Sequence, residues 1–232
     1  MYKRNQINEV LVQAIRSSHS RLDDATILTR IKRLLDFDRK SRLPAGGITP
    51  PVFAFHDGEA AGSGRDVTFS AYSVLALFVA LRLMSCGLPQ GRSVYLLRSF
   101  REALEREHRR MSEIDLDRLF QVRGTVIASA NAAGKEGLIA KGNVVENAEN
   151  MVFFCVHADL EAVGELKRTV MGQDGPRPDN ICRGRIELER RIALDAYGKS
   201  PTLIVELMNP LIQLNHLLSK TEPARRGRRR GT

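Results

Sequence analysis

The sequence predicts an α+β fold, with helices in the first half and short strands alternating with helices in the second. Two observations predict the helical half. Apolar residues recur at helical spacing between residues 5 and 35, and residues 71–84 are almost wholly apolar. A third observation predicts the sheet, because residues 151–158 form a short continuous apolar run, which is typical of a buried strand. A length of 232 residues fits one large domain or two small ones.

Positive charge is concentrated at the two ends of the chain. The net charge is +9, of which residues 1–45 contribute +5 and residues 224–232 another +5, so the residues between them sum to −1. This distribution is typical of a protein that binds a polyanion at its ends. Solubility alone is the alternative explanation.

Residues 5–42 predict two helices separated by a polar turn. Asn5 can cap a first helix with an apolar stripe over Ile7–Ile15, and Asp23 or Asp24 can cap a second with a stripe over Ile27–Leu35. Two short helices, the second with a basic outer face, form the helix-turn-helix pattern, in which the second helix enters the major groove. A solvated face of a small helical subdomain is the alternative. The candidate DNA-contact residues lie on the outer side or flank of the second helix and just beyond it: Thr29, Arg30, Lys32, Arg33, Arg39 and Lys40.

A connector rich in glycine and proline covers residues 46–68. Val52–Phe55 and Val67–Phe69 have strand character and are separated by a glycine-containing loop, which predicts a β-hairpin that would form a wing after a helix-turn-helix. Arg65 is the candidate for a phosphate contact from this wing. His56 and Asp57 are adjacent, and adjacent residues of an extended segment point to opposite faces, which favours a structural loop over a catalytic pair.

Residues 67–111 predict a helical hairpin. Ser70 can cap an apolar helix that reaches Met84 and must be buried on most sides. This helix is too short to cross a bilayer, which takes about 20 apolar residues. Gly87–Gly91 contains two glycines and a proline and ends it. One long amphipathic helix is predicted to follow.

This order of elements resembles the winged helix-turn-helix of MerR-type bacterial regulators and related excisionase-like proteins, over roughly residues 5–111. Ala25–Leu35 is similar to the recognition helix of that family, Phe69–Met84 to its third helix, and Gly87–Gln90 to its glycine-containing bend. The family usually has an arginine-tyrosine pair where this chain has Lys32-Arg33. The resemblance implies a dimer, recognition through the second helix and the wing, and a carboxy-terminal part that dimerises or senses a ligand.

Residues 112–223 predict a small α+β domain for dimerisation or sensing. Ile181–Ala196 fits either a strand or a helix. His157 lies in an apolar run, which is more typical of a core histidine than of a ligand, and no Ser, Cys or metal-ligand cluster completes a catalytic set. The other predicted elements are strands over 119–128, 151–158 and 202–207, a helix over 160–170, and a helix with Asn209 as cap and Pro210 in its first position.

The last nine residues are rich in arginine, and the chain contains three cysteines. Residues 224–232 cannot bury a core and are expected to be disordered when free, although arginine separated by glycine suits contact with phosphates or a narrow minor groove. Cys86, Cys155 and Cys182 are odd in number and have no paired spacing, which predicts reduced intracellular thiols rather than a zinc site. The arginines of the tail are further DNA-contact candidates: Arg225, Arg226, Arg228, Arg229 and Arg230.

Together the patterns predict a DNA-binding transcriptional regulator of bacterial or phage and mobile-element type, cytoplasmic and nucleoid-associated. It would bind double-stranded DNA as a homodimer, with no enzymatic activity, no cofactor, no metal and no membrane contact. Its parts would be a DNA-binding region over 1–111, an α+β domain over 112–223 and the tail over 224–232. Two alternatives stay open: a ligand-sensing or enzymatic α+β domain with basic ends used for localisation, and an RNA-binding protein.

Overall fold

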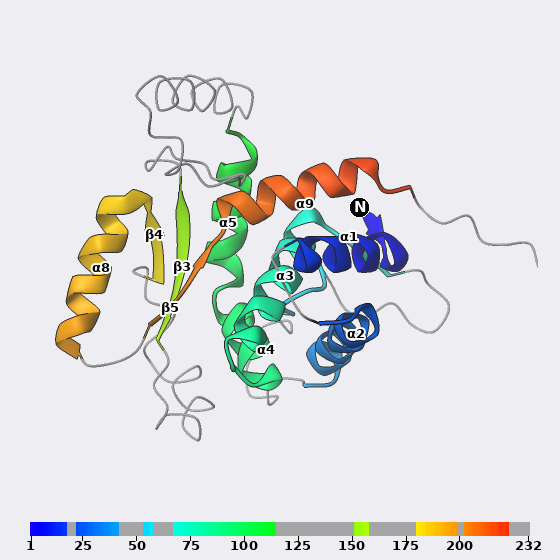
Figure 1. Cartoon of the computed structure of the whole chain (residues 1–232), viewed down its shortest axis with the longest axis horizontal. Helices are drawn as coiled ribbons and strands as arrows, with labels where there is room; N and C mark the ends of the chain where they lie inside the picture. Colours follow the sequence, from blue (N-terminus) through cyan, green and yellow to red (C-terminus); the bar gives the residue numbers. More distant parts are fainter. Residues whose placement is uncertain are drawn as a thin grey trace, which may run out of the picture. The chain divides into compact units, whose positions relative to one another are not determined.

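A computed structural model of the chain describes residues 1–17, 22–41, 53–57, 67–114, 151–157, 180–198 and 202–222. These ranges contain seven helices and two small antiparallel sheets, so the predicted α+β fold class is confirmed (Figure 1). The chain divides into two compact units, Met1–Arg101 with Ile212–Thr232 and Glu102–Leu211. We refer to these as the first and the second unit. Within the ranges above, every helix is too short or too polar to cross a membrane.

The helices and strands follow one another without a repeat. The first unit contains β1 (Tyr2–Lys3), α1 (Arg4–Arg16), α2 (Asp24–Lys40), β2 (Thr68–Phe69), α3 (Ala71–Ser85) and α4 (Gln90–Ser99). Next in the chain come α5 (Arg101–Ser112), β3 (Val152–His157), β4 (Ile181–Arg183), α8 (Gly184–Gly198), β5 (Thr202–Glu206) and α9 (Met208–Lys220). Most of α9 belongs to the first unit.

The first two helices form where the apolar pattern predicts them. The carboxylate of Asp23 accepts a hydrogen bond of 2.6 Å from the Thr26 amide and caps α2, as predicted. The first helix begins at Arg4 rather than after Asn5, and the Gln6 side chain accepts from the Lys3 amide. The apolar stripes of both helices are buried: Ile7, Val10, Leu11, Ala14 and Ile15 on α1, and Ile27, Ile31, Leu34 and Leu35 on α2.

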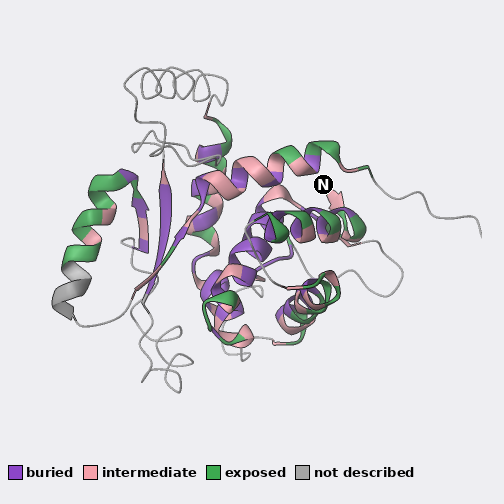
Figure 2. Cartoon of the chain, viewed as in Figure 1, coloured by how far each residue is buried: buried purple, intermediate pink, exposed green. Residues whose placement is uncertain are grey.

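Helix α3 is the core of the first unit, and Figure 2 shows it almost wholly buried. The predicted cap is confirmed, because the Ser70 hydroxyl accepts from the Ser73 amide at 3.2 Å. The helix ends in a Schellman motif: the Leu88 amide donates to the Leu83 carbonyl and the Gly87 amide to the Met84 carbonyl. Gly87 has a φ of +94°, which a residue with a Cβ adopts only under strain, so a glycine is needed here.

The single long helix predicted after the glycine turn is wrong, since the structure has α4 and α5 instead. The backbone leaves the helical region at Phe100, where φ is −97° and ψ is 4°. Phe100 is buried there, and the guanidinium of Arg101 donates to the carbonyl groups of Phe53 and His56. These contacts come from residues distant in sequence, so the periodicity of the helix does not reveal the break.

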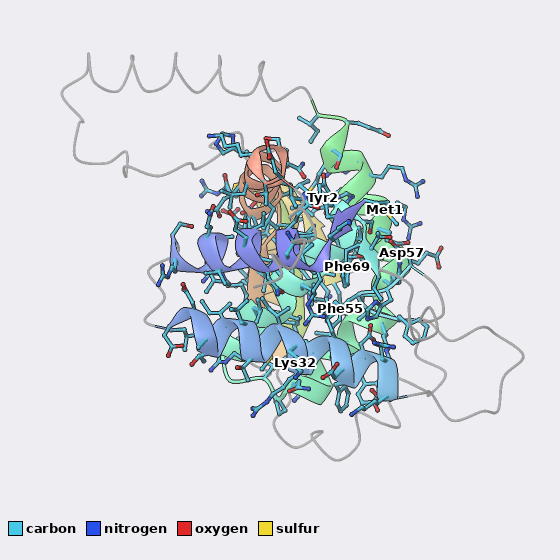
Figure 3. All side chains as sticks on the ribbon, turned by 90° about the vertical axis from the view of Figure 1, so that its right-hand side faces the viewer. Met1, Tyr2, Lys32, Phe55, Asp57 and Phe69 are labelled. Atoms are coloured by element: carbon cyan, nitrogen blue, oxygen red, sulfur yellow. The ribbon has the colours of Figure 1, made fainter. Side chains whose placement is uncertain are left out.

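The predicted β-hairpin wing is also not formed in the described part of the connector. Residues 53–57 contain no strand, and β2 pairs with β1 through Tyr2↔Phe69 and Lys3↔Thr68. Tyr2 and Phe69 are labelled in Figure 3. Side chains replace the missing strand partner, because Asp38 accepts from the amides of Ala54 and Phe55. The main chain of 53–57 is thereby hydrogen-bonded without a sheet.

The first unit also joins the two ends of the described chain. The side-chain amide of Gln6 donates to the Thr221 carbonyl at 2.9 Å, across 215 residues of sequence. The side-chain amide of Gln213 on α9 likewise donates to the hydroxyl of Ser17 at the end of α1. Helix α9 therefore completes a unit that α1 begins.

The second unit is built on a three-stranded antiparallel sheet with the order β4-β3-β5. Strands predicted over 151–158 and 202–207 are confirmed as β3 and β5. Ile181–Ala196 holds both predicted alternatives, a strand of three residues and then α8, with Gly184 at a φ of +73° between them. Leu188 of α8 packs against Cys182, while the neighbouring Arg183 reaches Glu107 of α5. Adjacent residues of a strand point to opposite faces, so α8 and α5 lie on opposite faces of the sheet.

The predicted cap of the last helix is wrong. Helix α9 begins at Met208, and the carboxylate of Glu206 accepts from the amides of Met208 and Asn209. Asn209 is therefore inside the first turn rather than before it. The strand predicted over 119–128, the helix over 160–170 and the tail over 224–232 lie outside the described residues.

Candidate nucleic-acid interface

The predicted DNA-contact residues of α2 share one surface, which we call the α2 basic face: Thr29, Arg30, Lys32, Arg33, Arg39 and Lys40. All of them are exposed except Arg30, which is partly buried on the flank. Figure 3 labels Lys32 on this helix. Within the part of the chain that the structure describes, the cations of this face form no salt bridge.

The helix presents this face because its other side is packed. Successive residues of an α-helix turn by about 100°, so Thr29, Lys32, Arg33 and Lys40 fall within an arc of roughly 100°. Ile27, Ile31, Leu34 and Leu35 occupy the remaining side and are at most 1% exposed. The hydrophobic contacts of α2 with α1, α3 and α4 therefore determine which residues reach solvent.

Of the acidic residues around α2, Asp23 and Asp24 are bound elsewhere and Asp38 is buried, whereas Asp36 lies within the arc of the α2 basic face. Asp23 caps the helix, and the hydrogen bond from the Thr26 amide lowers the pKa of its carboxyl. Asp24 forms a salt bridge of 2.7 Å with Arg16 at the end of α1. Asp36 lies near Arg4: burial lowers the pKa of that guanidinium, and the Asp36 charge opposes the effect. Within the helix, Asp36 therefore offsets part of the positive charge of the α2 basic face.

A buried ion pair fixes the carboxy-terminal end of α2. The Asp38 carboxylate is fully buried and accepts from Arg98 Nε at 2.8 Å and from the amides of Ala54 and Phe55 at 2.9 and 3.0 Å. Arg98 also donates to the carbonyl of Ser41 at 2.5 Å and to that of Asp38 itself. Every oxygen of this carboxylate is therefore bound, and α2 is held to α4 and to residues 53–57.

Two further contacts hold α2 against α4. The Gln90 side-chain amide donates to the Arg33 carbonyl at 3.0 Å. The rings of Phe37 and Tyr95 pack edge to face with centroids 5.9 Å apart. The main chain of Arg33 is thus held in place while its side chain stays exposed to solvent.

The His56–Asp57 pair is part of this scaffold. Asp57 forms a salt bridge of 2.8 Å with Arg101, whose guanidinium also binds the carbonyl groups of Phe53 and His56. The His56 imidazole is buried beside the rings of Phe53 and Phe69. Burial lowers the pKa of His56, and the charge of Asp38 opposes this shift. The contacts of both residues are structural.

The sequence reasoning missed the Asp38–Arg98 pair, although a signal for it exists. Asp38 lies four residues after Leu34 and therefore continues the buried stripe of α2, and Arg98 lies four residues after Val94 on α4. An acid and a base that both fall on apolar faces predict a buried ion pair. The remaining predicted contact residues lie outside the described ranges: Arg65, Arg225, Arg226, Arg228, Arg229 and Arg230.

The described residues contain no group of three or more His, Cys, Asp or Glu side chains that could hold a metal ion. No protein-family model matches the chain, and neither the curated proteins nor the solved structures contain a match to it. The resemblance to MerR-type regulators stays a prediction from the sequence.

Proposed function

We propose that this chain is a DNA-binding transcriptional regulator in which α2 is the recognition helix of a helix-turn-helix formed with α1. One observation carries the proposal: Lys32, Arg33, Arg39 and Lys40 are exposed along one packed helix, on which Asp24 and Asp38 are paired with Arg16 and Arg98. The sequence resemblance adds a homodimer to the proposal.

The dimensions of α2 are compatible with this role. Its 17 residues make a rod of about 25 Å at 1.5 Å per residue, and the major groove of B-DNA, about 12 Å wide, admits an α-helix. Arginine binds guanine edges and lysine binds phosphates, so Arg33 would read a base while Lys32 and Lys40 hold the backbone. Thr29 on the same arc can reach a base edge or a phosphate.

Two features of the connection limit what the proposal includes. Seven residues, Ser17–Asp23, separate α1 from α2, whereas the turn of a typical helix-turn-helix has about three or four. The wing proposed from Val52–Phe55 has no strand in its described part. The proposal therefore depends on the charge, exposure and rigid anchoring of α2, and the tail arginines enter it from their sequence alone.

The test replaces Arg30, Lys32 and Arg33 by alanine in the full chain. A DNA duplex is first selected from a random library by the unchanged protein. If each lost contact is worth roughly 1 kcal/mol or more, the triple variant should bind this duplex at least about 100-fold more weakly. The matched control replaces three exposed arginines of the second unit, Arg106, Arg109 and Arg190, and removes the same charge.

The outcomes separate specific from general binding. The control should lose only a few-fold in affinity, because long-range attraction alone is affected. Equal losses in the two variants, or full affinity in the α2 variant, would refute the assignment of α2. Single-stranded DNA and a structured RNA, measured beside the duplex at two salt concentrations, test the alternative classes of nucleic acid. Tighter binding of either would refute recognition of duplex DNA.

A further inference from the structure

The second unit brings two cysteine side chains together on one face of its sheet. The sulfur atoms of Cys155 on β3 and Cys182 on β4 are 3.7 Å apart. Both residues are thiols in this structure, and their exposed fractions are 0% and 3%. The third cysteine, Cys86, is exposed in the first unit. No pairing signal is present in the spacing of the cysteines, since 26 residues separate the two positions and the strand register brings them together.

The register of the sheet explains this proximity. Cys182 lies directly opposite Phe153, and Cys155 lies two residues further along β3 on the same face. Residues diagonal to one another across two strands have Cα atoms about 7–8 Å apart. The two sulfur atoms are nevertheless 3.7 Å apart, so a bond of about 2.05 Å requires β4 to shift toward β3. Met151 and Leu188 pack against the cluster formed by Phe153, Cys155 and Cys182, so the thiols lie among apolar side chains.

We propose that Cys155 and Cys182 form a reversible disulfide that links β4 to β3, and that its oxidant is a low-molecular-weight disulfide such as glutathione disulfide. One cysteine thiolate attacks a sulfur of the oxidant, forms a mixed disulfide and releases one glutathione thiolate. The second cysteine thiolate then attacks the protein sulfur of that mixed disulfide and releases the other glutathione. Two protein thiols are oxidised, one disulfide is reduced to two thiols, and the two cysteine protons pass to the released glutathione molecules.

The position of β4 gives the oxidant a route to these buried atoms. Among the described strands it is at the edge of the sheet, has three residues and pairs with β3. Beyond the ladder, Asn180 donates to the Cys155 carbonyl at 2.8 Å and Gly184 to the Met151 carbonyl at 2.7 Å. Arg183 donates through its amide to Glu187 at 2.6 Å and pairs through its guanidinium with Glu107. Short edge elements open locally at lower free energy than a central strand. Opening of β4 would expose both sulfur atoms, and its closure would bring them together again.

The decisive measurement compares the folded and the unfolded chain. The full-length protein with Cys86→Ser keeps both sheet cysteines and removes the exposed thiol. It is equilibrated in glutathione redox buffers with and without guanidinium chloride, quenched by alkylation, and mapped by mass spectrometry of its peptides. The ratio of oxidised to reduced pair gives the effective concentration of one thiol at the other in each state.

We expect the effective concentration in the folded chain to exceed that in the unfolded chain at least tenfold. A tenfold ratio equals 1.4 kcal/mol of stabilisation of the folded state by the bond. Any smaller ratio, or a folded chain in which each cysteine carries its own glutathione, would overturn the proposal. Two control chains add Cys155→Ala or Cys182→Ala to Cys86→Ser. They should yield no intramolecular bond, and a bond in either would show that the mapped species is not this pair.

Discussion

Each of the two units buries a carboxylate that binds arginine, and the two sites differ in how far the partner is removed from water. Asp38 in the first unit is 0% exposed, and the side chain of its partner Arg98 is 5% exposed. Glu107 in the second unit is 2% exposed, whereas its partners Arg183 and Arg110 keep 51% and 39% of their side-chain surface. The first pair is enclosed, and the second is open on the cationic side.

The exposure of the arginine partner determines how much each ion pair contributes to the stability of the fold. Removing one partner from an enclosed pair leaves a charge that water cannot solvate, which typically costs 3–5 kcal/mol. Glu107 shows the open case. Burial pushes the pKa of its carboxyl upward, but hydrogen bonds from Arg183 and Arg110 outweigh this and hold the pKa below its ordinary 4.5. Since two cations share this carboxylate and both contact solvent, the loss of one is partly replaced by the other and by water.

The largest effect is expected from Arg98→Met, which breaks the enclosed pair. The free energy of unfolding should fall by about 3–5 kcal/mol, because the buried Asp38 carboxylate would lose its ion-pair partner. Chemical denaturation followed by circular dichroism measures this loss. The double variant Asp38→Asn with Arg98→Met removes the stranded charge and should recover part of the stability. A loss below about 1 kcal/mol in the single variant would show that the pair is not enclosed in solution.

A smaller effect is expected from Arg183→Met in the second unit. Glu107 keeps Arg110 at 2.9 Å, so the free energy of unfolding should fall by only about 1–2 kcal/mol. The remaining Glu107 stabilisation should be present above the ordinary pKa and should disappear as the pH falls through the lower folded value. Arg185→Met is the control, because its pair with Glu189 is exposed and screened by water and should contribute little. Equal losses for Arg183→Met and Arg98→Met would contradict the comparison.

The smallest effect concerns His56 in the first unit, which is buried, and His108 in the second, which is half-buried. Burial lowers the pKa of His56 and of His108, so the folded chain binds fewer protons than the unfolded chain. The stability that their neutral forms provide is complete above the ordinary value of 6.5 and declines as the pH falls toward the folded values. We expect His56→Leu to remove part of this slope between about pH 7.5 and 5. If the slope of the unfolding free energy against pH is unchanged in this variant, other groups cause the whole pH dependence.

Local rules predicted the parts of the fold that depend on neighbours in sequence. Asp23, Ser70 and Gly87 cap or end their helices as expected, and the helical period placed Lys32 and Arg33 in solvent. The exposure of these two side chains follows from the buried apolar stripe of α2. The α2 basic face could therefore be predicted from the sequence. Its contact with DNA stays a prediction.

The failures have a different physical origin. The break at Phe100, the pairing of β2 with β1 and the bonds of residues 53–57 all depend on partners far along the chain, such as Asp38 with Phe55 or Arg101 with Phe53. The spacing of apolar residues within a helix or strand carries no information about such contacts. Asp38 and Arg98 could have been identified from the sequence, because both fall on the apolar faces of their helices. A charged residue in a buried stripe is the signal to search for its partner.

The hydrogen bond from Gln6 to Thr221 has a consequence for how the protein is made. The first unit contains the beginning of the chain and most of α9, so a ribosome must translate the whole of the second unit before the first can be completed. At about 5–20 residues per second, the growing chain waits roughly 6–24 s between finishing Arg101 and delivering Lys220. During this interval Gln6 and Ser17 lack the hydrogen bonds that Thr221 and Gln213 later form with them.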